Sequence, residues 1–218
     1  RDLCHIDGTW HRGIFVMLVD REGKILVQVR SDEKKSFPGC RDTSASGHLG
    51  RTVEYLDGAI KETEEEVFDS QVDLDRSRMV RVAEEGSLTV IHEIPETRLK
   101  DREHTSFYIY YITDEEKGLI KRQECEVKDL QWVALEDEMV RWRAWRDNPE
   151  GSRSVGIDYA ALGIDVLSNE SVVKELELVV GSMSDNGDET FADDDILMGF
   201  GTGTVRDRAV DVCGEVPL

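Results

Sequence analysis

Cysteine is scarce in this chain of 218 residues, and uninterrupted apolar runs are short throughout. The chain has four cysteines, and no two of them form a CxxC pair (Cys4, Cys40, Cys125 and Cys213). This scarcity predicts reduced thiols in an intracellular compartment, cytoplasmic or organellar, with neither a disulfide framework nor a zinc site. No stretch approaches the roughly 18 apolar residues of a transmembrane helix, and the N-terminus has no signal-peptide pattern, so no membrane association is expected.

Basic residues are also few relative to acidic ones. Forty-seven Asp and Glu residues oppose 27 Lys and Arg residues, which gives a formal net charge of -20 at pH 7. This balance argues against non-specific binding to nucleic acid or anionic membrane through overall charge, but it is compatible with a local basic groove. The chain opens at Arg1 without a methionine, so we expect that an upstream segment, with any targeting signal, was removed or left out.

The apolar content, 39% of the residues, is enough for one sizeable core, so we expect one main domain with an appendage. Apolar residues predict a hairpin of two strands over 13–19 and 24–30, followed by a polar loop over 31–47. Helical spacing predicts a helix of about four turns over 53–67, despite Gly58 in its interior. Two β-rich stretches and a strand that leads into a helix follow (78–95, 104–114 and 130–145). This order predicts an α+β or α/β sandwich.

The composition changes near Asn148. Residues 158–180 predict one or two helices, whereas residues 182–218 contain nine acids, two arginines and no convincing periodicity. We therefore divide the chain into a main domain (1–147), a helical extension (148–181) and an acidic, glycine-containing tail (182–218). The tail is expected to be disordered or to become ordered against a partner, and a solvated solubilising tail is an equally good interpretation.

The acidic stretch "GHLGRTVEYLDGAIKETEEEV", residues 47–67, carries the strongest chemical signal. On a helix, Glu62, Glu65 and Glu66 share a face, and Glu64 points away from them into solvent. Converging carboxylates repel one another unless a cation lies among them, and hard divalent cations prefer oxygen ligands. The alternative is an ordinary solvated face, which is what most charge runs are.

This stretch resembles the Nudix box, Gly-x5-Glu-x7-Arg-Glu-U-x-Glu-Glu-x-Gly-U, in which U is apolar. Gly47 falls on the opening glycine, Lys61 on the arginine, and Glu62, Glu65 and Glu66 on the three final glutamates. In the family these glutamates are the usual Mg2+ ligands and assist the attack of water. The resemblance therefore implies a site for Mg2+ or Mn2+ at these three residues, completed by the backbone carbonyl of Ser46 or Gly47.

Neighbouring segments extend the resemblance over about residues 5 to 147. The segments "SFPGCRDTSASGH", "DGTWHRGIFVML", "ILVQVRS" and "ECEVKDLQWVALED" are similar to segments of the Nudix subgroup related to isopentenyl diphosphate isomerase. The implied fold is a Nudix-type α/β/α sandwich with a mixed sheet.

The box also departs from the family pattern. Val53 replaces a glutamate, Lys61 replaces the arginine and loses its bidentate geometry, and Thr63, Phe68 and Asp69 alter the ending. Because Phe68 stands where glycine is expected, the helix is predicted to end without the usual left-handed cap. These changes are compatible with lower metal affinity, with a different substrate, or with a degenerate module that binds nucleotide, RNA or protein within a larger complex.

The isomerases resemble one another in a "TNxxCxHP" run whose cysteine transfers a proton. Ser46 occupies that position here, and Cys40 lies six residues too early to replace the cysteine, so isomerase activity is not expected. Glu126 aligns with the isomerase glutamate and is a candidate general base or fourth metal ligand, or else a plain loop acid.

The predicted reaction is metal-dependent hydrolysis of a diphosphate linkage in a nucleoside or other organic diphosphate, with the 5' end of RNA as a larger substrate. Catalytic candidates are Glu65, Glu66 and Glu126. Candidate substrate-binding residues, each with a surface or structural role as its alternative, are Arg30, Lys34, Lys35, His11 and His48.

Overall fold

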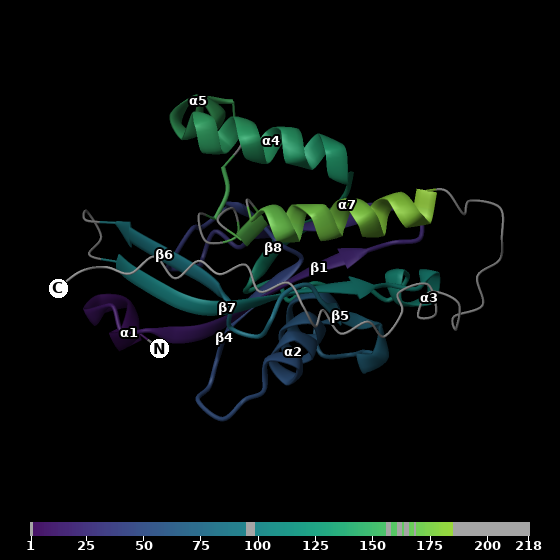
Figure 1. Cartoon of the computed structure of the whole chain (residues 1–218), viewed down its shortest axis with the longest axis horizontal. Coiled ribbons are helices and arrows are strands. Elements are labelled where there is room, and N and C mark those ends of the chain that lie inside the picture. The colour runs from purple at the N-terminus through teal and green to yellow at the C-terminus, as the bar shows by residue number, and fades with distance from the viewer. Residues whose placement is uncertain are drawn as a thin grey trace, which may run out of the picture. The chain divides into compact units, whose positions relative to one another are not determined.

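The computed structural model of this chain describes residues 2–94, 99–155, 158–160, 163, 166–167 and 169–184 (Figure 1). Most of the acidic tail, and parts of the stretch over 158–180, lie outside these residues, so the expectations for them stay predictions. Within the described residues, no helix combines the length and the apolar character needed to cross a membrane. The helices are α1 (Asp2–Asp7), α2 (Tyr55–Phe68), α3 (Asp114–Lys117), α4 (Leu135–Asp147), α5 (Pro149–Ser154), α7 (Glu170–Ser184) and the 3-10 turn η1 (Arg76–Arg78).

Eight strands form one mixed sheet. They are β1 (His11–Val19), β2 (Lys24–Arg30), β3 (Arg41–Asp42), β4 (Ala45–Leu49), β5 (Met79–Arg81), β6 (Leu88–Ile94), β7 (Leu99–Tyr111) and β8 (Val127–Ala134). The central path runs β3-β2-β1-β7-β5, while β4 pairs with β1, β6 with β7, and β8 with β2. Strands β1 and β7 are parallel, and the other pairs are antiparallel. The predicted hairpin over 13–30 is confirmed as β1 and β2.

Helices cover both faces of this sheet. Alternate residues of β1, namely Ile14, Val16 and Leu18, join the core under α2. In Figure 1, α7 lies over the opposite face, and its Val172, Leu176 and Val179 are buried. The predicted α/β/α sandwich with a mixed sheet is therefore confirmed.

The stretch over 31–47, predicted as a loop, is only partly a loop. It contains β3 and most of β4, and β4 pairs with β1 in the register Gly13↔His48 and Ile14↔Gly47. Serine and glycine are weak strand formers, so the local composition did not predict this strand. Pairing with the buried β1 outweighs that weak local preference. The correction matters because β4 brings Ser46 and Gly47 beside Glu66 and Glu62, in the second half of α2.

Helix α2 confirms the predicted helix, which begins two residues later than expected and ends at Phe68. Its interior Gly58 lets β4 approach closely, since a Cβ at Gly58 would lie 2.1 Å from Leu49 Cδ2. The prediction that the helix lacks a left-handed cap is wrong: Asp69 adopts φ 49° and ψ 38°, and its backbone N–H donates to the Glu64 carbonyl. Aspartate is one of the few non-glycine residues that tolerate this conformation.

The expectation that Glu64 serves only solvation is also wrong. Its carboxylate accepts a hydrogen bond of 2.8 Å from the backbone N–H of Leu74. Leu74 belongs to the core under α2, so the Glu64 carboxylate holds the segment that follows α2 in place by a hydrogen bond. Local periodicity could not show this bond, because it joins residues ten positions apart.

The extension contacts the sheet through residues 158–160. Arg41 N–H donates to the Asp158 carbonyl, and Ala160 N–H donates to the Arg41 carbonyl, both at 2.8 Å. Glu138 on α4 is fully buried and accepts hydrogen bonds from Arg41, Arg141 and Tyr159. Trp142 and Trp145 on the same helix are buried. The division at residue 147 stays a prediction, and residues on both sides of it share this hydrogen-bond network.

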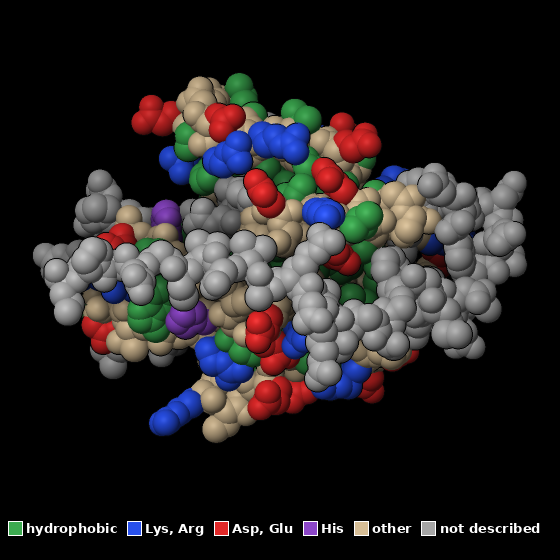
Figure 2. Space-filling view, viewed as in Figure 1, with side chains coloured by type: hydrophobic (Ala, Val, Ile, Leu, Met, Phe, Trp, Pro, Cys, Tyr) green, Lys and Arg blue, Asp and Glu red, His purple; other side chains and the backbone are tan. Residues whose placement is uncertain are grey.

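Charges of both signs are interspersed over the outer surfaces of α4 and α7 (Figure 2). Arg143 and Arg146 of α4 and Glu170, Lys174 and Glu177 of α7 line a common groove. A nucleic-acid surface requires a concentration of positive charge, and this face has none of that kind.

Replacing Glu138 by Ala should lower the free energy of unfolding by about 3 to 5 kcal/mol, because Arg41 and Tyr159 would lose the partner of a buried charge network. Urea denaturation measures the change. The matched control is Glu136→Ala, two residues earlier on the same helix and exposed, which should cost less than about 1 kcal/mol. Equal effects of the two variants would contradict a structural role for the Glu138 network.

Candidate functional site

A cavity of about 370 Å³ gathers most of the residues that the sequence singled out. Six predicted site residues line it: Arg30, Lys34, Lys35, Gly47, His48 and Glu126. The lining also includes residues that sequence reasoning missed, among them His5, Phe37, Asp42, Asp101, Glu103, Cys125 and Ala160. The cavity thus collects cations and carboxylates from β2, β4, β7, the loop after β2 and the segment before β8.

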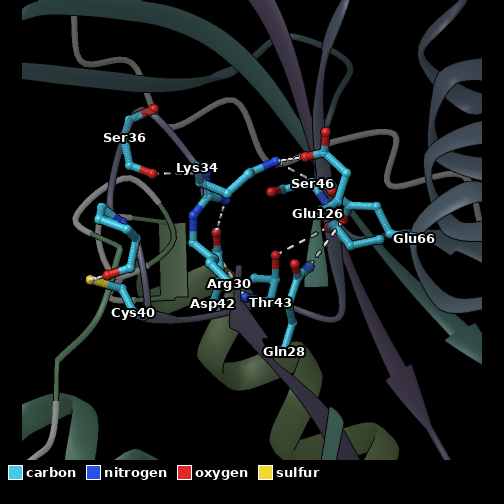
Figure 3. Close-up of polar contacts among 12 residues, drawn as sticks. Gln28, Arg30, Lys34, Ser36, Cys40, Asp42, Thr43, Ser46, Glu66 and Glu126 are labelled. Carbon is cyan, nitrogen blue, oxygen red and sulfur yellow. Dashed lines mark hydrogen bonds and ion pairs between the residues drawn. The ribbon is translucent and has the colours of Figure 1, made fainter. Parts of the chain in front are cut away.

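Glu66 lies directly behind the cavity wall. It is 3% exposed, and its carboxylate accepts hydrogen bonds from Gln28 Nε2 at 3.0 Å and from the backbone N–H of Ser46 at 3.1 Å (Figure 3). Burial raises the pKa of Glu66 to about 7, and the hydrogen bonds and nearby Lys34 only partly oppose this shift. The protein therefore holds a carboxyl group here that is poised to exchange its proton near neutral pH.

Lys34 lies between two carboxylates. Its ammonium group forms an ion pair with Glu126 and lies 4.0 Å from Glu66 Oε1 (Figure 3). Lys34 is supplied by the loop after β2, and Glu126 by the segment before β8, whose backbone also receives the N–H of Ser31. The ammonium thus supplies positive charge at the point where the two acidic groups face each other.

Glu62 and Glu65 share a different cation. Lys61 Nζ lies 2.8 Å from Glu65 and 3.6 Å from Glu62. The Glu62 side chain also packs on Gly47, where a Cβ would come within 2.4 Å of its carboxyl carbon. Glycine at position 47 therefore makes room for the first glutamate of the box.

The remaining predicted cations, Arg30 and Lys35, differ in burial. Arg30 is buried and donates to Asp42 at 2.9 Å and to the Ser36 carbonyl at 3.2 Å, while its Nε has no hydrogen-bond partner. Lys35 lines the cavity and is exposed. Arg30 is thus a positioned, largely neutralised guanidinium group, and Lys35 is the more accessible charge.

His11 and His48 belong to a cluster that the sequence did not predict. His5, His11, His48 and Asp101 each offer a ligand atom, and these atoms all lie within 4.8 Å of one another. Within the described part of the chain, no other group of His, Cys, Asp and Glu residues gathers in this way. Glu103 adjoins the cluster, 2.9 Å from His48 Nε2 and 3.6 Å from His11 Nε2.

The electrostatics of the cluster follow from burial and pairing. Burial opposes charging of His11, but contacts with Asp101 and Glu103 outweigh it and raise the pKa of His11 to about 10. Burial likewise opposes ionisation of Glu103, but hydrogen bonds from His11 and His48 hold its pKa at about 2. Burial lowers the pKa of His5. Without a bound cation, the cluster is therefore an ion pair of His11 and Glu103 beside a neutral His5.

The ligand chemistry of this cluster fits a metal ion. Asp101 Oδ1 is buried and lies 3.1 Å from His11 Nε2 and 3.6 Å from His5 Nε2, so two imidazoles and a carboxylate oxygen already face one another. The other ring nitrogen of His11, Nδ1, lies 3.1 Å from the Thr9 carbonyl, which leaves Nε2 directed at the cluster. Metal-ligating histidines commonly donate their other ring N–H to a backbone carbonyl in this way. Three imidazoles and a carboxylate suit zinc and manganese. The scarcity of cysteine did not bear on such a site, because no thiolate is needed.

A signal for the missed residues exists in the sequence. Asp101 and Glu103 are two positions apart, so on a strand they share a face. The predicted strand began at residue 104, whereas β7 begins at Leu99, and the charged "KDRE" segment hid its first half. The parallel pairing His11↔Glu103 then brings this face to the histidines.

The cysteine chemistry of an isomerase is not provided by Cys40. This residue is buried, and burial together with the nearby Asp158 carboxylate raises the pKa of its thiol to about 12. Ser46, at the position of the isomerase cysteine, lines the cavity. Cys125 also lines the cavity, but it does not stand at the position of the isomerase cysteine, and the absence of isomerase activity stays a prediction.

Curated relatives match short parts of the chain. "Nudix hydrolase 3" of Arabidopsis thaliana is 41% identical over 68 residues, which is 31% of this chain and 9% of that protein. "Isopentenyl-diphosphate Delta-isomerase 1" of Mesocricetus auratus is 42% identical over 50 residues, 21% of this chain and 22% of that one. The chain therefore spans only a small part of the length of these relatives.

The crystal structure of DR0079 from Deinococcus radiodurans is similar over 62% of this chain and 73% of its own, with 17% identity and a TM-score of 0.47. The family model described as NUDIX domain matches residues 9–154, a span that contains β1 to α5 and nearly all of the cavity lining. With this match over well more than half of its length, the chain belongs to the NUDIX domain family.

Proposed function

We propose that this Nudix domain hydrolyses a diphosphate linkage in a nucleoside or other organic diphosphate, with a divalent cation, Mg2+ or Mn2+. The observation that carries the proposal is the cavity itself, in which Arg30, Lys34 and Lys35 face Glu126, with Glu66 directly behind its wall. Cationic side chains attract phosphate oxygens, and the carboxylates supply a base and cation ligands.

Among the described residues, the three box glutamates do not gather as closely as the histidine cluster does, so their fit to a divalent cation rests on what surrounds each of them. Glu66 is desolvated, and the Lys34 ammonium lies 4.0 Å from it. The Glu62 side chain lies directly against Gly47, so its carboxylate and the Gly47 backbone are close together. Glu62, Glu65 and Glu66, with the carbonyl of Ser46 or Gly47, would hold the cation. When bound, such a cation neutralises phosphate charge and lowers the pKa of a bound water.

The chain's own groups then have distinct tasks. Arg30, Lys34 and Lys35 neutralise phosphate oxygens. A substrate phosphate that attracts Lys34 would separate it from Glu126, which is then free to take a proton from the attacking water. The water oxygen bonds to one phosphorus, the bond from that phosphorus to the bridging oxygen breaks, and the leaving phosphate keeps that oxygen. Glu126 lines the cavity whereas Glu65 pairs with Lys61 on the helix surface, so Glu126 is the stronger candidate for the base.

The histidine cluster is a second place for a cation in the same cavity. Its buried Asp101 carboxylate and its three imidazoles favour a borderline ion such as Zn2+ or Mn2+ over Mg2+. His48 and Glu103 line the cavity directly, so positive charge held there would add to the attraction for a phosphate group.

Turnover should require the box glutamates and a divalent cation. Glu66→Gln or Glu65→Gln should lower kcat by roughly 100-fold or more, and the matched control Glu64→Gln should not, since Glu64 binds Leu74 N–H instead. The measurement is release of phosphate, pyrophosphate and mononucleotide from nucleoside di- and triphosphates, dinucleotide polyphosphates and 5'-triphosphate RNA, with Mg2+ and with Mn2+. If the folded protein releases no product from any of these substrates, a module that binds its ligand without cleaving it is favoured.

Glu66→Gln should also stabilise the protein in a chelator, in a pH-dependent way. An acid whose folded pKa is raised costs stability as the pH rises from its ordinary 4.5 to the folded value of about 7. The gain in unfolding free energy should be near zero at about pH 4 and approach about 3 kcal/mol above about pH 8. Urea denaturation across this range checks the prediction; a gain that does not vary with pH would show that the Glu66 charge is not the cause.

The histidine cluster should bind one transition-metal ion. His48→Ala, and separately Asp101→Asn, should lose one equivalent of Zn2+ or Mn2+ after dialysis, measured by elemental analysis. Lowering the pH should release the same equivalent, because protonated imidazole cannot ligate. The control is His104→Ala, an exposed histidine that stacks on Trp10. Retention of the metal by both cluster variants would rule this site out.

A further inference from the structure

The C-terminal extension supplies part of the cavity wall. Ala160 lies beyond the residues that match the family model, yet it lines the cavity with Arg30, Lys34 and Glu126. Its side chain is small and 2% exposed. The space available inside the cavity therefore depends on a residue that the minimal domain does not contain.

The backbone of Ala160 is held from two directions. Its N–H donates to the Arg41 carbonyl at 2.8 Å, and the preceding residues form a parallel bridge in which Tyr159 pairs with Arg41. Tyr159 donates to the buried Glu138 at 2.6 Å, and Trp145 donates to Asp158 at 2.7 Å. Since these bonds tie the segment to β3 and α4, a larger side chain at position 160 has little freedom to turn away from the cavity.

A second contact joins the extension to the cation side of the cavity. A Cβ at Gly163 would lie 2.4 Å from Asp42 Oδ1, so the chain packs directly against this buried carboxylate. Asp42 in turn accepts from Arg30 at 2.9 Å. The extension therefore adjoins the Asp42–Arg30 pair and lies beside one of the groups proposed to neutralise phosphate.

We propose that Ala160 is a specificity-determining residue: its small side chain sets the size of the organic group that fits in the cavity beside the bound diphosphate. The inference rests on the proposed function for the nature of the ligand. The phosphates bind the cationic side chains, and a divalent cation would link them to the carboxylates, so the organic group must lie against the apolar lining, which includes Ala160, Phe37, Ile14 and Phe15. A nucleoside is bulky enough to contact this wall, and inorganic diphosphate is not.

A larger side chain at position 160 should weaken the binding of a diphosphate that carries a nucleoside and leave the binding of a bare diphosphate analogue unchanged. In the full chain, Ala160→Leu should weaken binding of α,β-methylene-ADP by at least about tenfold, because a few added methylene groups in a close-fitting pocket change affinity by that order. Binding of methylenediphosphonate, which carries no organic group, should change by less than about twofold on the same grounds. Ala160→Gly should bind α,β-methylene-ADP at least as tightly as the wild type. Isothermal titration calorimetry with Mg2+ measures these three affinities against those of the wild type.

The matched control is Ala144→Leu, the same substitution at an exposed position of α4, which should alter neither affinity. Thermal unfolding verifies that each variant is folded; if Ala160→Leu is not, Ala160→Val and Ala160→Gly test the same trend. Equal binding of α,β-methylene-ADP by the wild type and the enlarged variant, or equal losses for both ligands, would overturn the proposal.

Failure of the proposed function has a different signature. If the wild type shows no turnover but Ala160→Leu selectively loses α,β-methylene-ADP binding, the proposed hydrolase function is wrong and the proposed role of Ala160 is supported. If the protein turns over its substrates and Ala160→Leu raises KM equally for bulky and small ones, the hydrolase function is supported and the proposed role of Ala160 is wrong. A wild-type protein that binds neither probe would overturn both.

Discussion

The position of β1 in the sheet is the constraint on which the site depends. This strand is flanked by β4 on one side and β7 on the other, and both neighbours carry site residues. The registers His11↔Glu103 and Gly13↔His48 bring the cluster together across three strands. Gly13 makes this possible, since a Cβ there would lie 2.0 Å from Glu103 Oε2. A slip of one residue would turn these side chains to the other face of the sheet.

Charge compensation is the second theme of the site. Each cluster of carboxylates is paired with cations of the chain itself: Lys61 with Glu62 and Glu65, Lys34 with Glu66 and Glu126, and Arg30 with Asp42. Desolvated charges are costly unless they are paired, and here the pairs involve flexible lysines at the cavity and a fixed arginine beside it. Lys34 and Lys61 each contact two carboxylates through a flexible side chain, whereas Arg30 is held by Asp42 and the Ser36 carbonyl and keeps a buried Nε–H without a hydrogen bond.

Several elements were predictable from the residues alone. The hairpin, α2 and the three glutamates of the box follow from apolar spacing and from the resemblance to the family, because these signals are local. Strand β4, the early start of β7 and the cap at Asp69 were not predictable in this way. For the two strands, a contact with a distant segment outweighs a local preference: β4 pairs with the buried β1, and the charged start of β7 faces the histidines. At Asp69 the cap is local, and a left-handed aspartate takes the place of glycine.

The sequence by itself determined the fold class, the position of the acidic helix and the identity of Gly47, Glu62, Glu65, Glu66, Lys34 and Glu126 as candidates. These depend on periodicity and motif spacing, which a linear chain displays directly. Only the tertiary structure decided that Lys34 faces Glu66, that His5 and Asp101 join His11 and His48, and that Ala160 reaches the cavity. These relations join residues up to well over a hundred positions apart, and strand register and helix packing create them, which no local pattern encodes.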